Sequence, residues 1–230
     1  MTRLWRAVFA AAVIMLAGAC TADPGGEGRE IEAPIGRSFY WFRYIGGADI
    51  RDSCVAGAPD RMRIVYNAVW GEQVRIYDIV GPRMTARVLS DMTVGLNLEI
   101  GSAGDLLGPW KARKADRVMN AADLRRLDQA LAASGGFGPP ALVGRDLQSQ
   151  EFWWSVASCR NGRWGYAAYD FQTDGFGRVR FAEPLFALDP MARQVPPPPP
   201  RPTAGERMGR ESQQTHSKWR LAIGSNGPRY

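Results

Sequence analysis

The segment 151-EFWWSVASCRNGRWGYAAYDF-171 decides the fold class of this chain more directly than any other stretch. Two runs rich in aromatic residues, 151–159 and 163–171, flank the dipeptide Asn161-Gly162. Asparagine and glycine tolerate the positive φ angles that a two-residue turn between antiparallel strands requires. The segment therefore predicts a β-hairpin with its turn at residues 161–162.

A second hairpin is predicted nearer the N-terminus. Residues 61–70 and 73–80 alternate apolar side chains with arginine or other polar side chains, and Gly71-Glu72 connects them tightly. This period of two is typical of strands that bury one face. We expect further strands at 37–45, 84–89, 94–100 and 176–181.

One amphipathic helix is predicted between these strands. Leu124, Leu127 and Leu131 recur at helical spacing, Asn120 is a suitable N-cap, and a glycine pair at 135–136 ends the pattern. The predicted fold class is therefore α+β and predominantly antiparallel β. It comprises one β-rich domain over residues 37–192, with this helix packed on the sheet.

The formal net charge of +6 belongs mainly to the ends of the chain. Residues 193–230 hold seven basic side chains against two glutamates, and Arg3 and Arg6 precede the predicted domain, which leaves a net charge of −1 for residues 7–192. A nucleic-acid-binding domain would need a basic face. We therefore expect no nucleic-acid partner.

The C-terminal segment 193–230 is predicted to be a Pro-rich, basic and disordered tail. Residues 196–200 are all proline, which favours an extended polyproline II spacer. The residues beyond contain too few apolar side chains for a core. Only 218–223 would be able to order, as an edge strand or a docking peptide. The tail either carries a basic segment toward an anionic envelope surface or a partner, or has no specific role.

The first twenty residues have the layout of a secretory signal peptide. Arg3 and Arg6 precede an uncharged apolar block at 7–19, and Cys20 follows directly. This block is shorter than the roughly 20 residues that a bilayer-spanning helix needs. We therefore predict a signal peptide at 1–19 and, because residues 21–28 are polar and rich in glycine, a flexible tether at 20–36.

The sequence Leu16-Ala-Gly-Ala-Cys20 resembles the lipobox of bacterial lipoproteins. In that family the cysteine is lipidated, carries palmitate among its acyl chains and becomes the first residue of the mature chain. Ala17 departs from the large aliphatic residue usual at its position, and residues 17–19 also fit ordinary signal peptidase, which leaves a plainly secreted protein as the alternative. Thr21 is not the aspartate that favours inner-membrane retention. The resemblance thus implies a lipid anchor at Cys20, in the outer membrane and facing the periplasm.

The cysteine count is consistent with a lipidated Cys20. The chain holds three cysteines, Cys20, Cys54 and Cys159, and an odd count in an exported protein leaves one thiol to explain. If Cys20 carries lipid, Cys54 and Cys159 remain as a pair in a compartment that permits disulfides. We predict that they form a disulfide; the alternative is two buried free thiols.

Several common chemistries lack the residues they need. The only histidine is His216, in the predicted tail, so the predicted domain offers neither a histidine-dependent triad nor a usual zinc site. No phosphate-binding loop or dinucleotide motif occurs. We therefore predict no catalytic, metal-ligating or cofactor-binding residue and no cofactor. The acidic residues that remain as candidates for an acid/base pair are Glu72, Asp78, Glu99, Asp170 and Asp174.

Aromatic residues and arginines are the remaining candidates for binding. The aromatic rings either supply the core or form a platform for sugars or extended peptides. They lie at 39–42 and 152–154 and at Trp164, Tyr166 and Tyr169. We favour the core. The arginines of the predicted strands are expected to line a solvated face rather than an anion site; they are Arg61, Arg63, Arg75 and Arg87.

These observations favour an exported, lipid-anchored cell-envelope protein that acts as a non-enzymatic binding or structural module. Its expected partners are the membrane, through the anchor, and an envelope protein or glycan. The alternative is an exported hydrolase of a glycan or cell-wall polymer that uses two carboxylates. A third hypothesis is a structural spacer whose active part is the Pro-rich tail.

Overall fold

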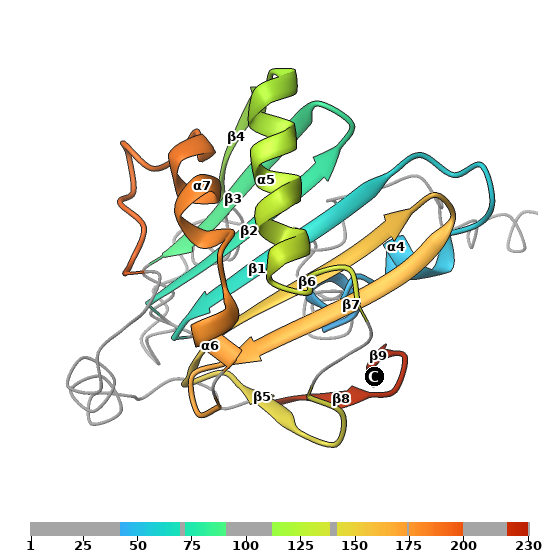
Figure 1. Ribbon diagram of the computed structural model, residues 1–230. Helices are drawn as coiled ribbons and strands as arrows, with labels where there is room; N and C mark the ends of the chain where they lie inside the picture. Colours follow the sequence, from blue (N-terminus) through green and yellow to red (C-terminus); the bar gives the residue numbers. More distant parts are fainter. Residues whose placement is uncertain are drawn as a thin grey trace, which may run out of the picture. The chain divides into compact units, whose positions relative to one another are not determined.

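The computed structural model describes residues 42–69, 72–90, 112–138, 142–173, 175–199 and 220–229, all within one compact unit (Figure 1). Six strands form the main antiparallel sheet: β1 (Arg61–Ala68), β2 (Gln73–Val80), β3 (Arg83–Ser90), β4 (Arg113–Val118), β6 (Phe152–Arg160) and β7 (Arg163–Asp170). Their order across the sheet is β4-β3-β2-β1-β6-β7. A smaller sheet, ordered β5-β8-β9, contains β5 (Asp146–Gln148), β8 (Arg220–Gly224) and β9 (Gly227–Pro228).

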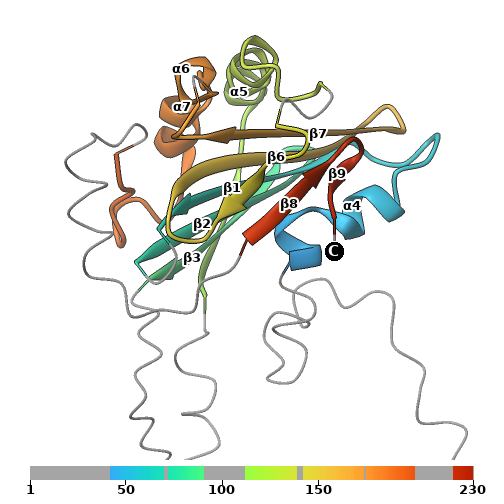
Figure 2. The same ribbon diagram turned by 90° about the horizontal axis from the view of Figure 1, so that it is seen from below.

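Helices cover both faces of the main sheet. The described helices are α4 (Ala48–Asp52), α5 (Ala121–Ala133), α6 (Gly175–Arg178) and α7 (Ala182–Leu188). Figure 2 shows α5, α6 and α7 on one side of the sheet, and α4 with β8 and β9 on the other. The chain is thus predominantly antiparallel β with a few short helices, as the sequence predicts.

Strand β6, which lies between β1 and the edge strand β7, is buried on both faces. Trp154 and Val156 pack into the core beneath α5 and α7, whereas Trp153 and Ala157 pack into the core beneath α4 and β8. The Trp154 ring stacks on Tyr66, with 4.1 Å between ring centroids. The aromatic residues of this strand are therefore core residues, which agrees with the favoured interpretation.

Both predicted hairpins are present. Asn161 and Gly162 have φ angles of 50° and 68°, which is the geometry of a type I′ turn between β6 and β7. Strands β1 and β2 also pair antiparallel, and β3 continues the meander. The strand predicted at 94–100 lies outside the described residues.

The predicted helix is α5. The Asn120 side chain accepts a hydrogen bond from the Asp123 backbone N–H at 2.8 Å, so Asn120 is the N-cap. Gly135 has a φ angle of 73°, a left-handed conformation that glycine adopts without strain at the end of a helix. Leu127 and Leu131 are buried against the sheet.

Two predicted strands are helical instead. Residues 42–45, the described part of the strand predicted at 37–45, form a helical turn that ends at Gly46 and Gly47. The strand predicted at 176–181 begins inside α6. Both segments bury aromatic or aliphatic side chains, but they do so on a face of the sheet rather than within it. An aromatic-rich segment can bury its rings by packing on one face of the sheet, without pairing with a strand.

The predicted tail is partly ordered. Strand β8 pairs with β5, and Leu221 and Ile223 are buried beneath the main sheet. Val195 is also buried. The described residues of the predicted tail, 193–199 and 220–229, thus contribute apolar side chains that the body of the protein covers. Strand β8 overlaps 218–223, the segment that was expected to be able to order as an edge strand. Residues 200–219 lie outside the described part.

Within the described ranges, no helix combines the length and the apolar character that crossing a bilayer requires.

Candidate functional site

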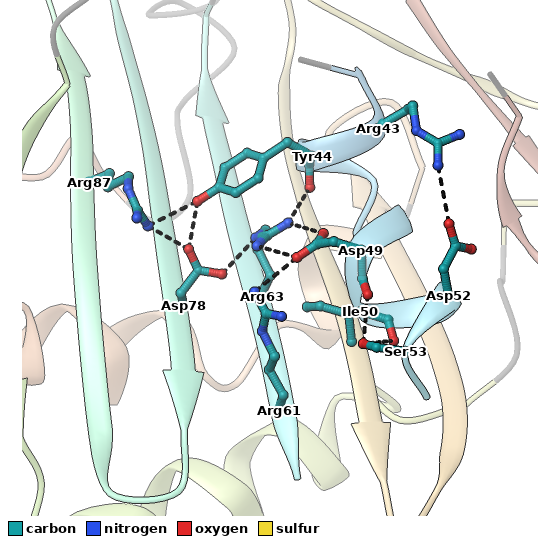
Figure 3. A network of polar contacts seen from close by, with 10 residues as sticks. All are labelled: Arg43, Tyr44, Asp49, Ile50, Asp52, Ser53, Arg61, Arg63, Asp78 and Arg87. Atoms are coloured by element: carbon teal, nitrogen blue, oxygen red, sulfur yellow. Dashed lines mark hydrogen bonds and ion pairs between the residues drawn. The ribbon is translucent and has the colours of Figure 1, made fainter. Parts of the chain in front are cut away.

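A network of charged side chains joins α4 to the main sheet (Figure 3). Its centre is Arg63 on β1, whose side chain is only 1% exposed. Arg63 Nη1 donates to Asp49 Oδ1 at 2.6 Å, and Arg63 Nε donates to Asp78 Oδ1 at 2.7 Å. Arg63 thus bridges a carboxylate on α4 and a carboxylate on β2. We call the set Tyr44, Asp49, Arg61, Arg63, Asp78 and Arg87 the α4 clamp.

The remaining members of the α4 clamp surround this bridge. The Tyr44 hydroxyl donates to Asp78 Oδ2 at 2.6 Å, and Arg87 Nη1 donates to the same oxygen at 2.6 Å. The guanidinium carbon of Arg63 lies 3.6 Å from the centroid of the Tyr44 ring, a cation–π contact. Arg61 donates to Asp49 at 2.9 Å. Every carboxylate of the clamp therefore faces at least two cationic donors.

The sheet register and one glycine assemble the clamp. Arg63 lies directly opposite Asp78 in the pairing of β1 with β2. Gly47 precedes α4 with a φ angle of 71°, and a Cβ atom there would lie 2.3 Å from the Cβ of Ala157. Only glycine fits this approach. Gly47 thereby allows α4 to lie against the sheet with Asp49 above Arg63.

The clamp holds its groups in fixed protonation states. Burial opposes ionisation of Asp78, but Arg63, the Tyr44 hydroxyl and Arg87 outweigh that effect and lower the pKa of Asp78 below its ordinary value. Burial raises the pKa of the Tyr44 hydroxyl well above its ordinary value, although Arg63 partly opposes the shift. Neither group is ready to exchange a proton near pH 7. The clamp is therefore an ion-pair network that fastens α4, not an acid/base pair.

The expectation of a solvated arginine face is wrong for two arginines. Arg63 lies in the clamp, and Arg75 is fully buried on the opposite face of the sheet. Arg75 forms an ion pair with Asp189 and donates to the Val195 carbonyl, and the Tyr77 hydroxyl donates to Asp189 at 2.8 Å. Asp189 follows α7, far from β2 in the sequence. Alternation along the strand does not reveal such distant partners.

The candidate carboxylates are not brought together in the described residues. Asp78 belongs to the clamp, and Asp170 accepts hydrogen bonds from the backbone and hydroxyl of Thr173. The register puts Asp78 and Asp170 three strands and four residues apart, about 20 Å at ordinary sheet spacings. Glycosidase carboxyl groups lie about 5–9.5 Å apart. Glu72 directly precedes β2, and Glu99 and Asp174 lie outside the described residues.

The predicted disulfide is present between Cys54 and Cys159, with 5.5 Å between their Cα atoms. It joins the loop after α4 to the end of β6. The same loop lies against the hairpin turn, because a Cβ atom at Gly162 would come within 2.7 Å of the Ala56 Cα atom. Asp60 also accepts a hydrogen bond from the Asn161 backbone N–H at 2.7 Å. The disulfide therefore belongs to a tightly packed corner of the protein.

A groove of about 400 Å³ lies at the turn end of β7, the edge strand of the sheet. We call it the β7 groove; the side chains that matter for its chemistry are Phe137, Arg160, Arg163, Trp164, Tyr166 and Asn226. Successive strand residues point to opposite faces, so Arg163 lies on the α5 side of the edge and Trp164 on the other. The groove therefore curves around the edge of the sheet.

Trp164 is held in place within this groove. Its indole N–H donates to the Asn226 carbonyl at 3.2 Å, and its ring lies 6.3 Å from that of Tyr166 at an interplanar angle of 26°. A Cβ atom at Gly227 would touch both rings at 3.4 Å. The β8–β9 turn thus packs directly against this aromatic pair.

The sequence interpretation named part of each site, including Asp78 and Trp164, but it did not single out the other residues that build them. Tyr44 and Asp49 lay in or beside a predicted strand and loop, and nothing in the pattern linked them to Arg63. For the β7 groove a signal was available, because Arg160 and Arg163 flank the Asn161-Gly162 turn. A two-residue hairpin turn sets such flanking residues directly opposite each other. The pair of like charges could thus have been found from the turn alone.

No group of three or more His, Cys, Asp or Glu side chains suited to a metal ion occurs in the ranges that the structure covers.

Comparison with known proteins finds no family model, no curated protein and no solved structure that matches this chain.

Proposed function

We propose that this chain is an exported, lipid-anchored cell-envelope protein whose β-rich domain is a non-enzymatic binding module. The observation that carries the proposal is the Cys54–Cys159 disulfide. It uses two of the three cysteines and leaves Cys20, behind the signal-like segment, as the one to be explained. A disulfide is also typical of proteins that work in an oxidising compartment.

The contacts of the described carboxylates support binding rather than hydrolysis. Asp78 is ion-paired within the α4 clamp, and Asp170 is engaged by Thr173 beside β7. A hydrolase that used these two groups would need them much closer than the register allows. The β7 groove, in contrast, offers aromatic rings and cations on the outside of an edge strand. Concave sites of this size with a few polar groups are typical of ligand binding.

The lipid anchor gives a direct prediction for Cys20→Ala. In cells fed labelled palmitate, the wild-type protein is expected to carry label and to sediment with membranes. Cys20→Ala removes the sulfur to which the lipid would attach, so we expect loss of both the label and membrane sedimentation. Stable membrane attachment requires more than one acyl chain. Because Cys20→Ala would carry none, we expect no partial retention in the membrane fraction.

Thr21→Ala is the matched control for this experiment, because it changes the neighbouring residue and leaves the thiol in place. It should retain the label. Unchanged labelling and sedimentation of Cys20→Ala would overturn the proposed anchor and favour a secreted protein.

A further inference from the structure

We propose that the β7 groove binds a carboxylate-bearing glycan, with the Arg163 guanidinium holding the carboxylate and the half-buried Trp164 ring contacting a sugar ring. This inference deepens the proposed binding function and rests on it. It names the class of ligand from the charges, the rings and the path of the groove.

The charge of the groove favours an anion with a single negative charge. Arg160 and Arg163 lie directly opposite each other in the pairing of β6 with β7, and like charges in that position repel. Asp128 on α5 neutralises the charge of Arg160, because its carboxylate lies 2.5 Å from Arg160 Nη1. Arg163 is exposed, and within the described part of the chain its side chain forms no hydrogen bond or ion pair. One guanidinium is thus left without a counter-charge.

A carboxylate matches that guanidinium in shape as well as in charge. The planar fork of arginine donates two parallel N–H···O bonds to the two oxygens of a carboxylate. Among the described residues that line the groove there is no aspartate or glutamate to compete for Arg163. The guanidinium of Arg160 lies over the Phe137 ring, with its carbon 4.2 Å from the centroid, and adds positive potential beside the site.

The aromatic side of the groove suits a sugar. The face of a tryptophan ring carries negative charge density that attracts the C–H groups on the flat side of a pyranose. Tyr166 is buried and supports the Trp164 ring from behind. Trp164 is fixed by its hydrogen bond to Asn226 and by the packing of Gly227, so little freedom is lost when a ligand binds. The amide of Asn226 and the hydroxyl of Ser225 line the same groove and can meet sugar hydroxyls.

The path of the groove requires more than one sugar ring. Arg163 and Trp164 point to opposite faces of the edge strand, so a ligand that meets both must cross the edge. A volume of about 400 Å³ lies within the range of about 300–1,000 Å³ that is usual for small-molecule sites. A disaccharide with one carboxylate is the smallest ligand that satisfies both conditions.

The test compares two disaccharides that differ in one lactyl ether group, which carries the carboxylate. The full mature chain, purified in detergent, is titrated by calorimetry with N-acetylglucosaminyl-N-acetylmuramic acid and with N,N′-diacetylchitobiose. We expect the acidic disaccharide to bind about tenfold more tightly, as one charge-assisted hydrogen-bonded pair predicts. Arg163→Gln should abolish this preference. Because Arg163 is exposed and without partners in the described chain, the variant should fold normally.

Arg113→Gln is the matched control, because Arg113 is an exposed arginine on the opposite edge strand, β4. It should bind like the wild type. Equal affinity for the two disaccharides, no binding of either, or an unchanged preference in Arg163→Gln would overturn the inference. Binding of an acidic tripeptide in place of the acidic disaccharide would also overturn it and assign the groove to a peptide. None of these outcomes depends on the anchor at Cys20, which the labelling experiment tests separately.

Discussion

Asp78→Asn is expected to lower the free energy of unfolding at pH 7 by about 3 kcal/mol, because it leaves a buried arginine without half of its counter-charge. The Arg63 side chain is only 1% exposed and bonds to Asp78 and Asp49. In the variant, an amide N–H would also face the donors of Tyr44 and Arg87 that now share Asp78 Oδ2. Urea denaturation of the wild type and the variant measures the difference.

Asp52→Asn is the control for this experiment. Asp52 pairs with Arg43 and Arg51, but its side chain is 51% exposed. Ion pairs in solvent contribute about 0–1 kcal/mol, so its removal should change stability by less than about 1 kcal/mol. Equal effects of the two variants would contradict the central role of Arg63.

The ion pair between Asp78 and Arg63 determines how the free energy of unfolding depends on pH. The pKa of Asp78 is lowered in the folded protein, whereas in the unfolded chain it returns to about 3.9. Acid therefore favours the unfolded state: the stabilisation from Asp78 is complete above pH 4–5 and is lost as the pH falls through the folded pKa. The difference in stability between the wild type and Asp78→Asn should shrink as the pH falls from about 5 to below the unfolded pKa of about 3.9. A difference that stayed constant over that interval would show that the carboxylate charge is not what stabilises the clamp.

Replacing both disulfide cysteines, in Cys54→Ala/Cys159→Ala, is expected to lower the free energy of unfolding by about 2–5 kcal/mol. The two residues are 105 positions apart, so the bond closes a long loop in the unfolded chain. The chain-entropy model gives about 4.7 kcal/mol for a loop of about a hundred residues, as an upper figure. Thermal and urea unfolding of the oxidised protein and the double variant measure the effect.

Reduced wild-type protein is the natural control for the double variant, because it lacks the bond but keeps both side chains. The two should unfold at similar urea concentrations, both below the oxidised protein. The oxidised mature protein should also contain no free thiol when Cys20 carries lipid. Finding two free thiols in unreduced protein would contradict the disulfide.

Local chemistry accounts for the parts of the fold that the sequence predicts well. The Asn161-Gly162 turn and the Asn120 cap each satisfy backbone groups within a few residues, so their outcome does not depend on the rest of the chain. The sequence did not predict strand β4, because its residues do not show the alternation typical of a strand. Its sequence, Arg113–Val118, contains four charged residues and reads as a loop, and such charge is how an edge strand avoids pairing with other chains.

The sites depend on contacts that pattern alone does not show. A turn limited to Gly71-Glu72 would not have placed Arg63 opposite Asp78; the observed connection begins at Val69, which has a φ angle of 69°. Asp49 reaches the clamp from a helix that the sequence did not predict, and Asp189 reaches Arg75 from beyond α7. Buried arginines need such partners, and their partners came from segments that were misassigned or far away in the sequence.

The most direct test of the proposed anchored binding module is the mass of its mature N-terminal peptide, isolated from the membrane fraction. Ordinary signal peptidase and the lipoprotein route both make Cys20 the first residue, so the cleavage site alone does not separate them. We predict a peptide that begins at Cys20 and carries the three acyl chains of the lipoprotein modification. An N-terminal peptide that begins at Cys20 without added mass, or an uncleaved segment, would contradict the account.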